Sequence, residues 1–153
     1  MLLSPVVRRR AAEATFRLLF SLIFVVAGAT HLLRPEAVAG RLERAPMGFL
    51  ATAWASPEAL VILAGIALLA GGLALLLGFR VRAAALLLML VLLPITLTVQ
   101  VGAAELGPLF KNVALLGGLV HFAAAGAGAW SLDAAWRRRP KAPPATLAGP
   151  PSF

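Results

Sequence analysis

Three observations in the sequence predict an all-α integral membrane protein, a four-helix bundle of up-down topology with both termini in the cytoplasm. The first is composition: of 153 residues, 61% are hydrophobic and only 13% are charged, whereas roughly a quarter of the residues in a soluble domain are charged. The second is a set of four apolar stretches, each long enough to cross a bilayer, which takes about 20 residues. The third is the position of the basic residues, most of which lie on one side of these stretches. A soluble fold is excluded because the chain lacks the polar surface to cover so large a core.

The four predicted spans cover about residues 15–33, 58–79, 83–101 and 109–129. Together they form one membrane domain over residues 15–133. A short basic lead, residues 1–14, precedes this domain. A basic, proline-rich tail, residues 134–153, follows it and is predicted to be disordered.

The first span also has features of a secretory signal peptide, since Arg8–Arg10 precede an apolar run that ends near Ala27–Ala29. A membrane span is favoured because the apolar residues continue to Leu33 and three more spans follow. Arg17 lies about one turn inside this span, and its side chain is expected to reach the cytoplasmic interface.

The segments between the spans carry recognisable start and stop signals. Residues 34–57 mix apolar and charged side chains, which predicts one or two short interfacial helices on the outer face. Ser56 and Pro57 mark the start of the second span, because serine caps a helix and proline suits its first position. The short turn Gly78–Arg82 predicts that the second and third spans are antiparallel neighbours. Pro94 is expected to kink the third span.

The net charge of +8 is interpreted as a topology signal rather than as affinity for nucleic acid. Ten of the fourteen basic residues fall on one predicted side: Arg8, Arg9, Arg10, Arg17, Arg80, Arg82, Arg137, Arg138, Arg139 and Lys141. The other four are Arg34, Arg41, Arg44 and Lys111. By the positive-inside rule both termini are cytoplasmic, in a bacterial-type cytoplasmic (inner) membrane. The absence of cysteine excludes disulfides, thiol catalysis and thiolate metal sites, and no metal site is predicted.

Four polar side chains are predicted to gather at the outer mouth of the bundle, where they form a candidate ligand-binding cluster. In the predicted topology the first span ends outward at His31 and the second begins at Glu58, while the third ends at Gln100 and the fourth begins at Lys111. Polar groups inside a membrane are costly and usually point into the bundle. No motif identifies catalytic residues, so the sequence leaves open whether the protein is an enzyme.

Lys111 is the most unusual member of this cluster. It lies on the outer side, against the positive-inside tendency, and in the first turn of a helix, where the helix dipole disfavours a cation by roughly 0.3–1 kcal/mol. Three interpretations remain open: the lysine reaches the lipid headgroups, it pairs with Glu58 or Glu105, or it binds an anionic or carbonyl-bearing ligand. Glu58 is the first expected partner.

Helical spacing predicts which side of the fourth span faces the other helices. A stripe that begins at Lys111 continues through Ala114, Gly117, Gly118, His121 and Ala125. Small residues mark close helix approach in membranes, so this stripe is expected to face inward. Asn112 falls on the opposite side and is expected to point away. On the second span, Glu58, Gly65 and Gly72 share one stripe that is also expected to face a partner helix.

His121 is predicted to lie near mid-membrane, where a histidine is costly unless it is bonded. An interhelical hydrogen bond, proton transfer and contact with a cofactor all remain open as its role. Helical rise places it about 15 Å from His31 along the membrane normal. This separation disfavours a haem or metal site shared by the two histidines of one protomer.

Several short motifs occur in order between Phe16 and Asp133. They are Phe20–Phe24 with Ala27, Gly28 and His31; Pro57 and Glu58; Gly78–Arg80 with Arg82; Lys111–Leu115 with Gly117 and Gly118; and Ser131–Asp133. In these motifs the chain resembles the DoxX family of small four-span membrane proteins. The most specific are KN-x-A-L-x-GG and the closing Ser-Leu-Asp. Many relatives carry a histidine on the third span, where this chain has Thr96, Thr98 and Gln100, so histidine chemistry is not expected there.

The resemblance implies a function linked to membrane redox enzymes. The family is named for a subunit of a quinol-oxidising complex, and relatives are subunits of thiosulfate:quinone oxidoreductase. The resulting hypothesis is an accessory or membrane-anchoring subunit of a quinone-linked oxidoreductase, with quinone as the candidate ligand and a redox enzyme as the partner. One alternative is a structural or assembly protein whose polar groups only set helix register. Another is a small transporter, which would need a homo-oligomer because four spans alone do not enclose a conducting path.

Overall fold

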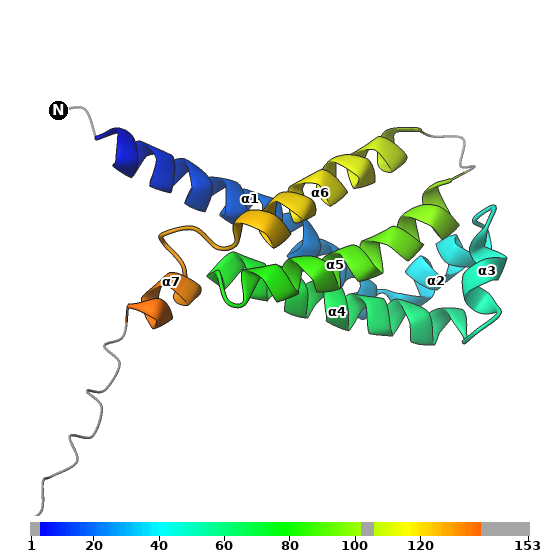
Figure 1. The fold of residues 1–153 in the computed structure, drawn as a ribbon. Helices are drawn as coiled ribbons and strands as arrows, with labels where there is room; N and C mark the ends of the chain where they lie inside the picture. Colours follow the sequence, from blue (N-terminus) through cyan, green and yellow to red (C-terminus); the bar gives the residue numbers. More distant parts are fainter. Residues whose placement is uncertain (1–3, 102–105, 139–153) are drawn as a thin grey trace, which may run out of the picture.

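The computed structural model describes residues 4–101 and 106–138, and every regular element in these ranges is a helix (Figure 1). In chain order the elements are α1 (Pro5–Leu33), α2 (Pro35–Glu43), α3 (Gly48–Thr52), α4 (Pro57–Leu77), α5 (Val81–Ile95), the π-helix η1 (Thr96–Gln100), α6 (Leu106–Ala125) and α7 (Leu132–Arg137). The predicted all-α fold is confirmed.

Four stretches of helix are long and apolar enough to cross a membrane: α1, α4, α5 together with η1, and α6. They correspond to the four predicted spans. Large apolar side chains are exposed along each of them, among them Leu19, Val26, Leu63, Leu90 and Val113. Apolar surface of this extent is stable when lipid, not water, covers it. The chain is therefore a multi-pass membrane protein.

Helix α1 begins at Pro5 rather than near residue 15. The side chain of Ser4 accepts a hydrogen bond of 3.4 Å from the backbone N–H of Val7, and Pro5 occupies the first turn, a combination that favours helix initiation. Most of the predicted basic lead, residues 1–14, is thus part of α1. Figure 1 shows this part of α1 extending past the other helices.

Helices α1 and α4 make the closest helix–helix approach in the bundle, and glycines allow it. A methyl group added at Gly28 would lie 2.6 Å from the backbone nitrogen of Leu69. One added at Gly72 would lie 3.0 Å from the backbone nitrogen of Val25. Gly65 and Gly72 are both buried, as their predicted stripe requires. Small residues bring helix backbones together in membranes because packing, not hydrophobic burial, drives their association.

The short turn between α4 and α5 makes these helices antiparallel neighbours, as predicted. Gly78 ends α4 in the left-handed conformation with φ of 69°, which glycine adopts without steric cost. Helix α5 then packs against α6. The buried core of the bundle contains Phe24, Leu68, Leu75, Leu88, Leu119 and Phe122.

The C-terminal helix α7 folds back onto the turn between α4 and α5. The carboxylate of Asp133 accepts hydrogen bonds from the backbone N–H groups of Arg80, at 2.7 Å, and Val81, at 3.1 Å. The N–H of Asp133 in turn donates to the carbonyl of Gly78 at 3.0 Å.

Helix α6 ends at Ala125, earlier than the predicted end of the fourth span near residue 129. The tail predicted to be disordered, residues 134–153, begins inside a helix, because residues 134–137 belong to α7. Residues 139–153 lie outside the described ranges.

Arg17 holds the chain between α6 and α7 in place. Its side chain is 4% exposed and donates hydrogen bonds to the carbonyls of Ala127 and Trp130, the latter at 2.6 Å. Arg17 was expected at the cytoplasmic interface; its guanidinium lies beside Gly78 at the end of α4, but it is covered by protein rather than open to water. The physical reason is that residues 126–131 form no helix, so their carbonyl groups need donors, and a guanidinium can supply several at once.

Helices α2 and α3 cross the end of the bundle at which α1 ends and α4 begins (Figure 1). We call this the cavity end, and the opposite end, at Gly78–Arg80, the turn end. The two short helices confirm the prediction for residues 34–57. Ala39 and Leu42 of α2 are buried, and α2 packs mainly against α4. The cavity end is thus partly covered by chain, and an open cavity lies beneath it.

Candidate functional site

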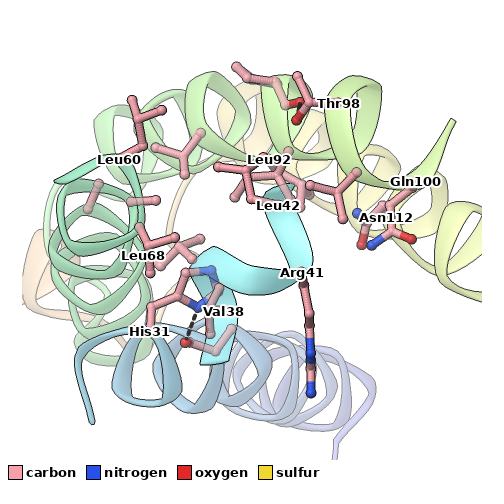
Figure 2. Close-up of a pocket in the computed structure, with 18 of the residues that line it drawn as sticks. His31, Val38, Arg41, Leu42, Leu60, Leu68, Leu92, Thr98, Gln100 and Asn112 are labelled. Carbon is pink, nitrogen blue, oxygen red and sulfur yellow. Dashed lines mark hydrogen bonds between the residues drawn. The ribbon is translucent and has the colours of Figure 1, made fainter. Parts of the chain in front are cut away.

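A cavity of about 520 Å³ lies at the cavity end, between all four membrane helices and beneath α2 and α3 (Figure 2). Its walls are mainly apolar and include Phe24, Leu42, Leu60, Val61, Leu68, Leu92 and Leu115. Ligand pockets in proteins commonly have volumes of 300–1,000 Å³, apolar walls and a few well-placed polar groups. The size and lining of this cavity match that description.

Three of the four residues predicted to form the polar cluster line this cavity: His31, Gln100 and Lys111. In Figure 2, His31 projects from α1 on one side of the cavity. Gln100 lies on another side, where η1 and α6 meet. The fourth, Glu58, is exposed in the first turn of α4 and does not line the cavity. The fold thus brings together side chains from the ends of three different helices.

The expected pair between Lys111 and Glu58 does not form, and the other acid considered, Glu105, lies outside the described residues. Within residues 4–101 and 106–138, the only ion pair joins Arg9 to Glu13. The reason lies in the helix arrangement: α4 packs against α1, α5 and α2, whereas α6 packs against α5 and η1. Lys111 is exposed at the rim of the cavity, where it is accessible both to lipid headgroups and to a bound ligand.

His31 is held by its own helix. Its Nδ1 lies 2.7 Å from the carbonyl oxygen of Ala27. Because a carbonyl only accepts, Nδ1 carries the proton, and in the neutral ring Nε2 is left as an acceptor. The Cβ of His31 packs so closely on Gly65 that a methyl group there would lie 2.9 Å away. Gly65 therefore sets the position of His31 at the cavity wall.

Asn112 also lines the cavity, although helical spacing predicted that it would point away from the other helices. That prediction is wrong: Asn112 is 5% exposed, and its Nδ2 donates a hydrogen bond of 3.1 Å to Oγ1 of Thr96. The face of α6 that packs inward carries Asn112, Leu119 and Phe122. The small-residue stripe is divided: an added methyl group at Gly117 would meet nothing within 4 Å, whereas one at Gly118 would overlap the ring of Phe20 on α1.

The sequence did contain a signal for Asn112. An asparagine amide has several hydrogen-bonding groups and is costly in an apolar environment unless they are bonded. Asn112, Leu119 and Phe122 also share one helical face, since seven residues make nearly two turns. On α6 this polar group marks the buried face.

The π-helix η1 begins two residues after Pro94 and forms the adjoining wall. Proline has no N–H to donate and disturbs the helical ladder around it. Two threonine hydroxyls bond carbonyls of this region: Thr96 donates to Leu92 at 2.6 Å, and Thr98 donates to Pro94 at 2.8 Å. Pro94, Thr98 and Gln100 all line the cavity. π-Helical turns occur frequently at functional sites.

His121 does not belong to the cavity. Its side chain is exposed, and its ring meets the rings of Phe16 and Phe122 edge-on at 6.3 and 5.6 Å. In the described part of the chain it forms no interhelical hydrogen bond, so aromatic contacts take the place of the expected bond. In the same ranges no group of three His, Asp or Glu side chains is placed to hold a metal ion.

A comparison with family models gives a match to DoxX over residues 12–101. The match spans α1 to η1, which supply most of the cavity wall, and covers more than half of the chain. Neither the curated proteins nor the solved structures gave a match. The KN-x-A-L-x-GG and Ser-Leu-Asp motifs lie beyond the matched range. Because the match itself covers more than half of the chain, the chain belongs to the DoxX family of membrane proteins.

Proposed function

We propose that the cavity binds the head group of a membrane quinone, in its oxidised or reduced form, and that the protein is an accessory or membrane-anchoring subunit of a quinone-linked oxidoreductase. The observation that carries the proposal is the convergence of His31, Gln100 and Lys111 on one apolar cavity of about 520 Å³. A quinone would supply two-electron redox chemistry when bound, while this chain would bind and orient it.

The lining suits such a molecule. A quinone head group is flat and mainly apolar, with oxygen atoms at its edge, so it needs apolar walls and a few hydrogen-bonding groups. The cavity offers both, with leucine and phenylalanine side chains around the polar groups of Gln100 and Lys111. The amide N–H groups of Gln100 and the ammonium group of Lys111 are donors that match carbonyl oxygens.

The charge distribution supports one orientation of the cavity relative to the two sides of the membrane. Ten of the fourteen basic residues belong to the turn end or to the two terminal segments, which the positive-inside rule assigns to the cytoplasm. The cavity end then faces the outer side of the inner membrane. A partner enzyme that delivers electrons to the cavity would bind on that side.

The proposal is tested by purifying the protein in mild detergent and measuring extracted quinone by mass spectrometry. We expect quinone in an amount near that of the protein, and markedly less from Gln100→Leu and Lys111→Met. Glu58→Gln is the matched control, because Glu58 lies at the same end of the bundle but outside the cavity. A helical, monodisperse preparation that carries no quinone, and binds none when quinone is added, would refute the proposal.

A further inference from the structure

We infer that the turn end carries a binding site for an anionic phospholipid. Apolar side chains of α7 and of the turn between α4 and α5 receive an acyl chain, and Arg80 binds the charged head group. The site lies at the opposite end of the bundle from the cavity. The inference is therefore independent of the proposed function and does not require that the cavity bind a quinone.

A small apolar hollow forms the first half of the site. Its volume is about 280 Å³, and it is lined by Phe79 of the turn and by Leu132, Ala135 and Trp136 of α7. The hollow exists because α7 folds back on the turn, where Asp133 bonds the backbone of Arg80 (Figure 1). The rings of Phe79 and Trp136 lie with their centroids 6.2 Å apart. Walls of this kind suit a hydrocarbon chain.

The residues around the hollow indicate that it lies at the membrane interface. Leu77, at the end of the membrane helix α4, is exposed and belongs to the apolar surface that lipid covers. Trp136 is also exposed, and the cations Arg137 and Arg138 follow it directly. A tryptophan between an apolar surface and basic residues is typical of the interface between lipid and water. The hollow is thus placed where an acyl chain meets its head group.

Arg80 places a cation beside the hollow. Its guanidinium carbon lies 5.9 Å from the centre of the Phe79 ring. The backbone of Arg80 has φ of 44°, a left-handed conformation that is uncommon outside glycine. The hydrogen bond of 2.7 Å from its N–H to Asp133 holds this conformation. Glycine would adopt it without cost, so the arginine indicates a role for its side chain beyond the turn itself.

In the part of the chain that the structure describes, most exposed cations of the turn end have no acidic partner. The acids at this end are Glu13, which pairs with Arg9 at 3.0 Å, and Asp133, which accepts from two backbone N–H groups. No ion pair within residues 4–101 and 106–138 involves the exposed cations Arg80, Arg82, Arg137 and Arg138. A phosphate group supplies the missing anion, since guanidinium groups bind phosphate oxygens through paired hydrogen bonds.

A lipid fits these observations better than an acidic segment of a partner protein. Because the hollow adjoins Arg80, the occupant needs a hydrocarbon chain and a negative charge in one molecule. An anionic phospholipid joins the two directly, and basic residues next to a membrane span attract such lipids. An acidic protein segment carries the charge but not the hydrocarbon chain.

The test measures lipid binding to the full-length protein in mild detergent by native mass spectrometry. The probes are phosphatidylglycerol, which is anionic, and phosphatidylcholine with identical acyl chains, which is neutral overall. We expect the wild type to bind phosphatidylglycerol several-fold more tightly. Arg80→Gly should weaken phosphatidylglycerol binding by about fivefold, the effect of one basic residue near an anionic surface, and leave phosphatidylcholine unchanged. Trp136→Ala should weaken both lipids, because it removes a wall of the hollow.

The variants separate charge from folding. Arg80→Gly keeps the turn, because glycine adopts a φ of 44° freely, and Arg80→Lys should retain most of the preference. Two matched controls remove an exposed arginine and an exposed tryptophan at the cavity end, Arg44→Gly and Trp54→Ala. Both controls should bind the two lipids as the wild type does.

Three outcomes overturn the inference. The first is equal binding of the two lipids by the wild type, and the second is unchanged phosphatidylglycerol binding in Arg80→Gly. The third is displacement of the lipid at equal concentration by inorganic phosphate, which would show an anion site without a lipid, or by a glutamate-rich peptide, which would assign the surface to a protein partner. None of these outcomes changes the quinone content, so the proposed function stands or falls separately.

Discussion

The carboxylate of Asp133 in α7 accepts a hydrogen bond of 2.7 Å from the backbone N–H of Arg80, which lies 53 residues earlier in the chain. A second backbone N–H, that of Val81, donates to the same carboxylate at 3.1 Å. These two N–H groups open α5 and have no partner within their own helix. Asp133 thus acts as the cap of a helix that is remote in sequence, and the Ser-Leu-Asp motif acquires a structural role.

The first prediction concerns this cap. Asp133→Ala should lower the free energy of unfolding by about 2 kcal/mol, because hydrogen bonds to a charged group contribute roughly 1.5–3 kcal/mol. Asp133→Asn should lower the free energy of unfolding by less, since its amide oxygen still accepts one hydrogen bond. Reversible unfolding in a mixed-detergent titration gives the values. Glu43→Ala, an exposed change at the end of α2, is the control, and an equal loss in both variants would contradict the capping role.

The second prediction concerns Arg17. Its guanidinium bonds two carbonyls in the chain between α6 and α7, so Arg17→Met should release α7 and unfold the backbone at Arg137 and Arg138, whose side chains are already exposed, for cleavage by trypsin. We expect cleavage there to become at least several-fold faster, together with a loss of about 2–3 kcal/mol in stability.

The matched control for Arg17 is Arg9→Met on the same helix. Arg9 forms only an exposed ion pair with Glu13 at 3.0 Å, and such pairs contribute at most about 0.5 kcal/mol. Its rate of cleavage at Arg137 and Arg138 should equal that of the wild type. Unchanged trypsin resistance in Arg17→Met would show that the two carbonyl contacts do not hold α7.

The third prediction contrasts two glycines. Gly28→Ala should destabilise the bundle by about 1–3 kcal/mol, because the new methyl group would lie 2.6 Å from a backbone atom of α4, which cannot move aside. Gly117→Ala should be neutral or stabilising by up to about 1 kcal/mol, because nothing lies within 4 Å and alanine favours a helix. Thermal unfolding in detergent measures both. A destabilising Gly117→Ala would mean that this face of α6 has a partner in the assembled protein.

The fourth prediction fills the cavity. Ala67 lines it from α4, so Ala67→Phe should place a ring inside and reduce bound quinone by about tenfold or more, which corresponds to about 1.4 kcal/mol of binding free energy. Ala70→Phe adds the same ring one turn further along α4 at an exposed position outside the cavity. Its quinone content should match the wild type. Equal quinone in both variants would place the ligand elsewhere.

The sequence predicted the parts of this structure that depend on local properties. Membrane spans follow from the summed hydropathy of about 20 consecutive residues, and all four were located. The capping pair Ser56 and Pro57 marked the start of α4, and Gly78 marked its end. The alternating direction of the spans predicted that His31, Gln100 and Lys111 lie at the same end of the bundle. All three do line one cavity there.

Only the tertiary structure decided which face of each helix points inward and which polar groups meet. On α6 every face is largely apolar, since lipid and the protein core accept the same side chains, so the pattern did not show that Asn112 faces Thr96 while Gly117 faces outward. The roles of Arg17 and Asp133 likewise depend on backbone groups that the fold leaves without partners at distant points of the chain. Hydropathy is additive along the sequence and therefore readable from it. Hydrogen-bond pairing between helices depends on their mutual placement, which the packing of the whole bundle sets.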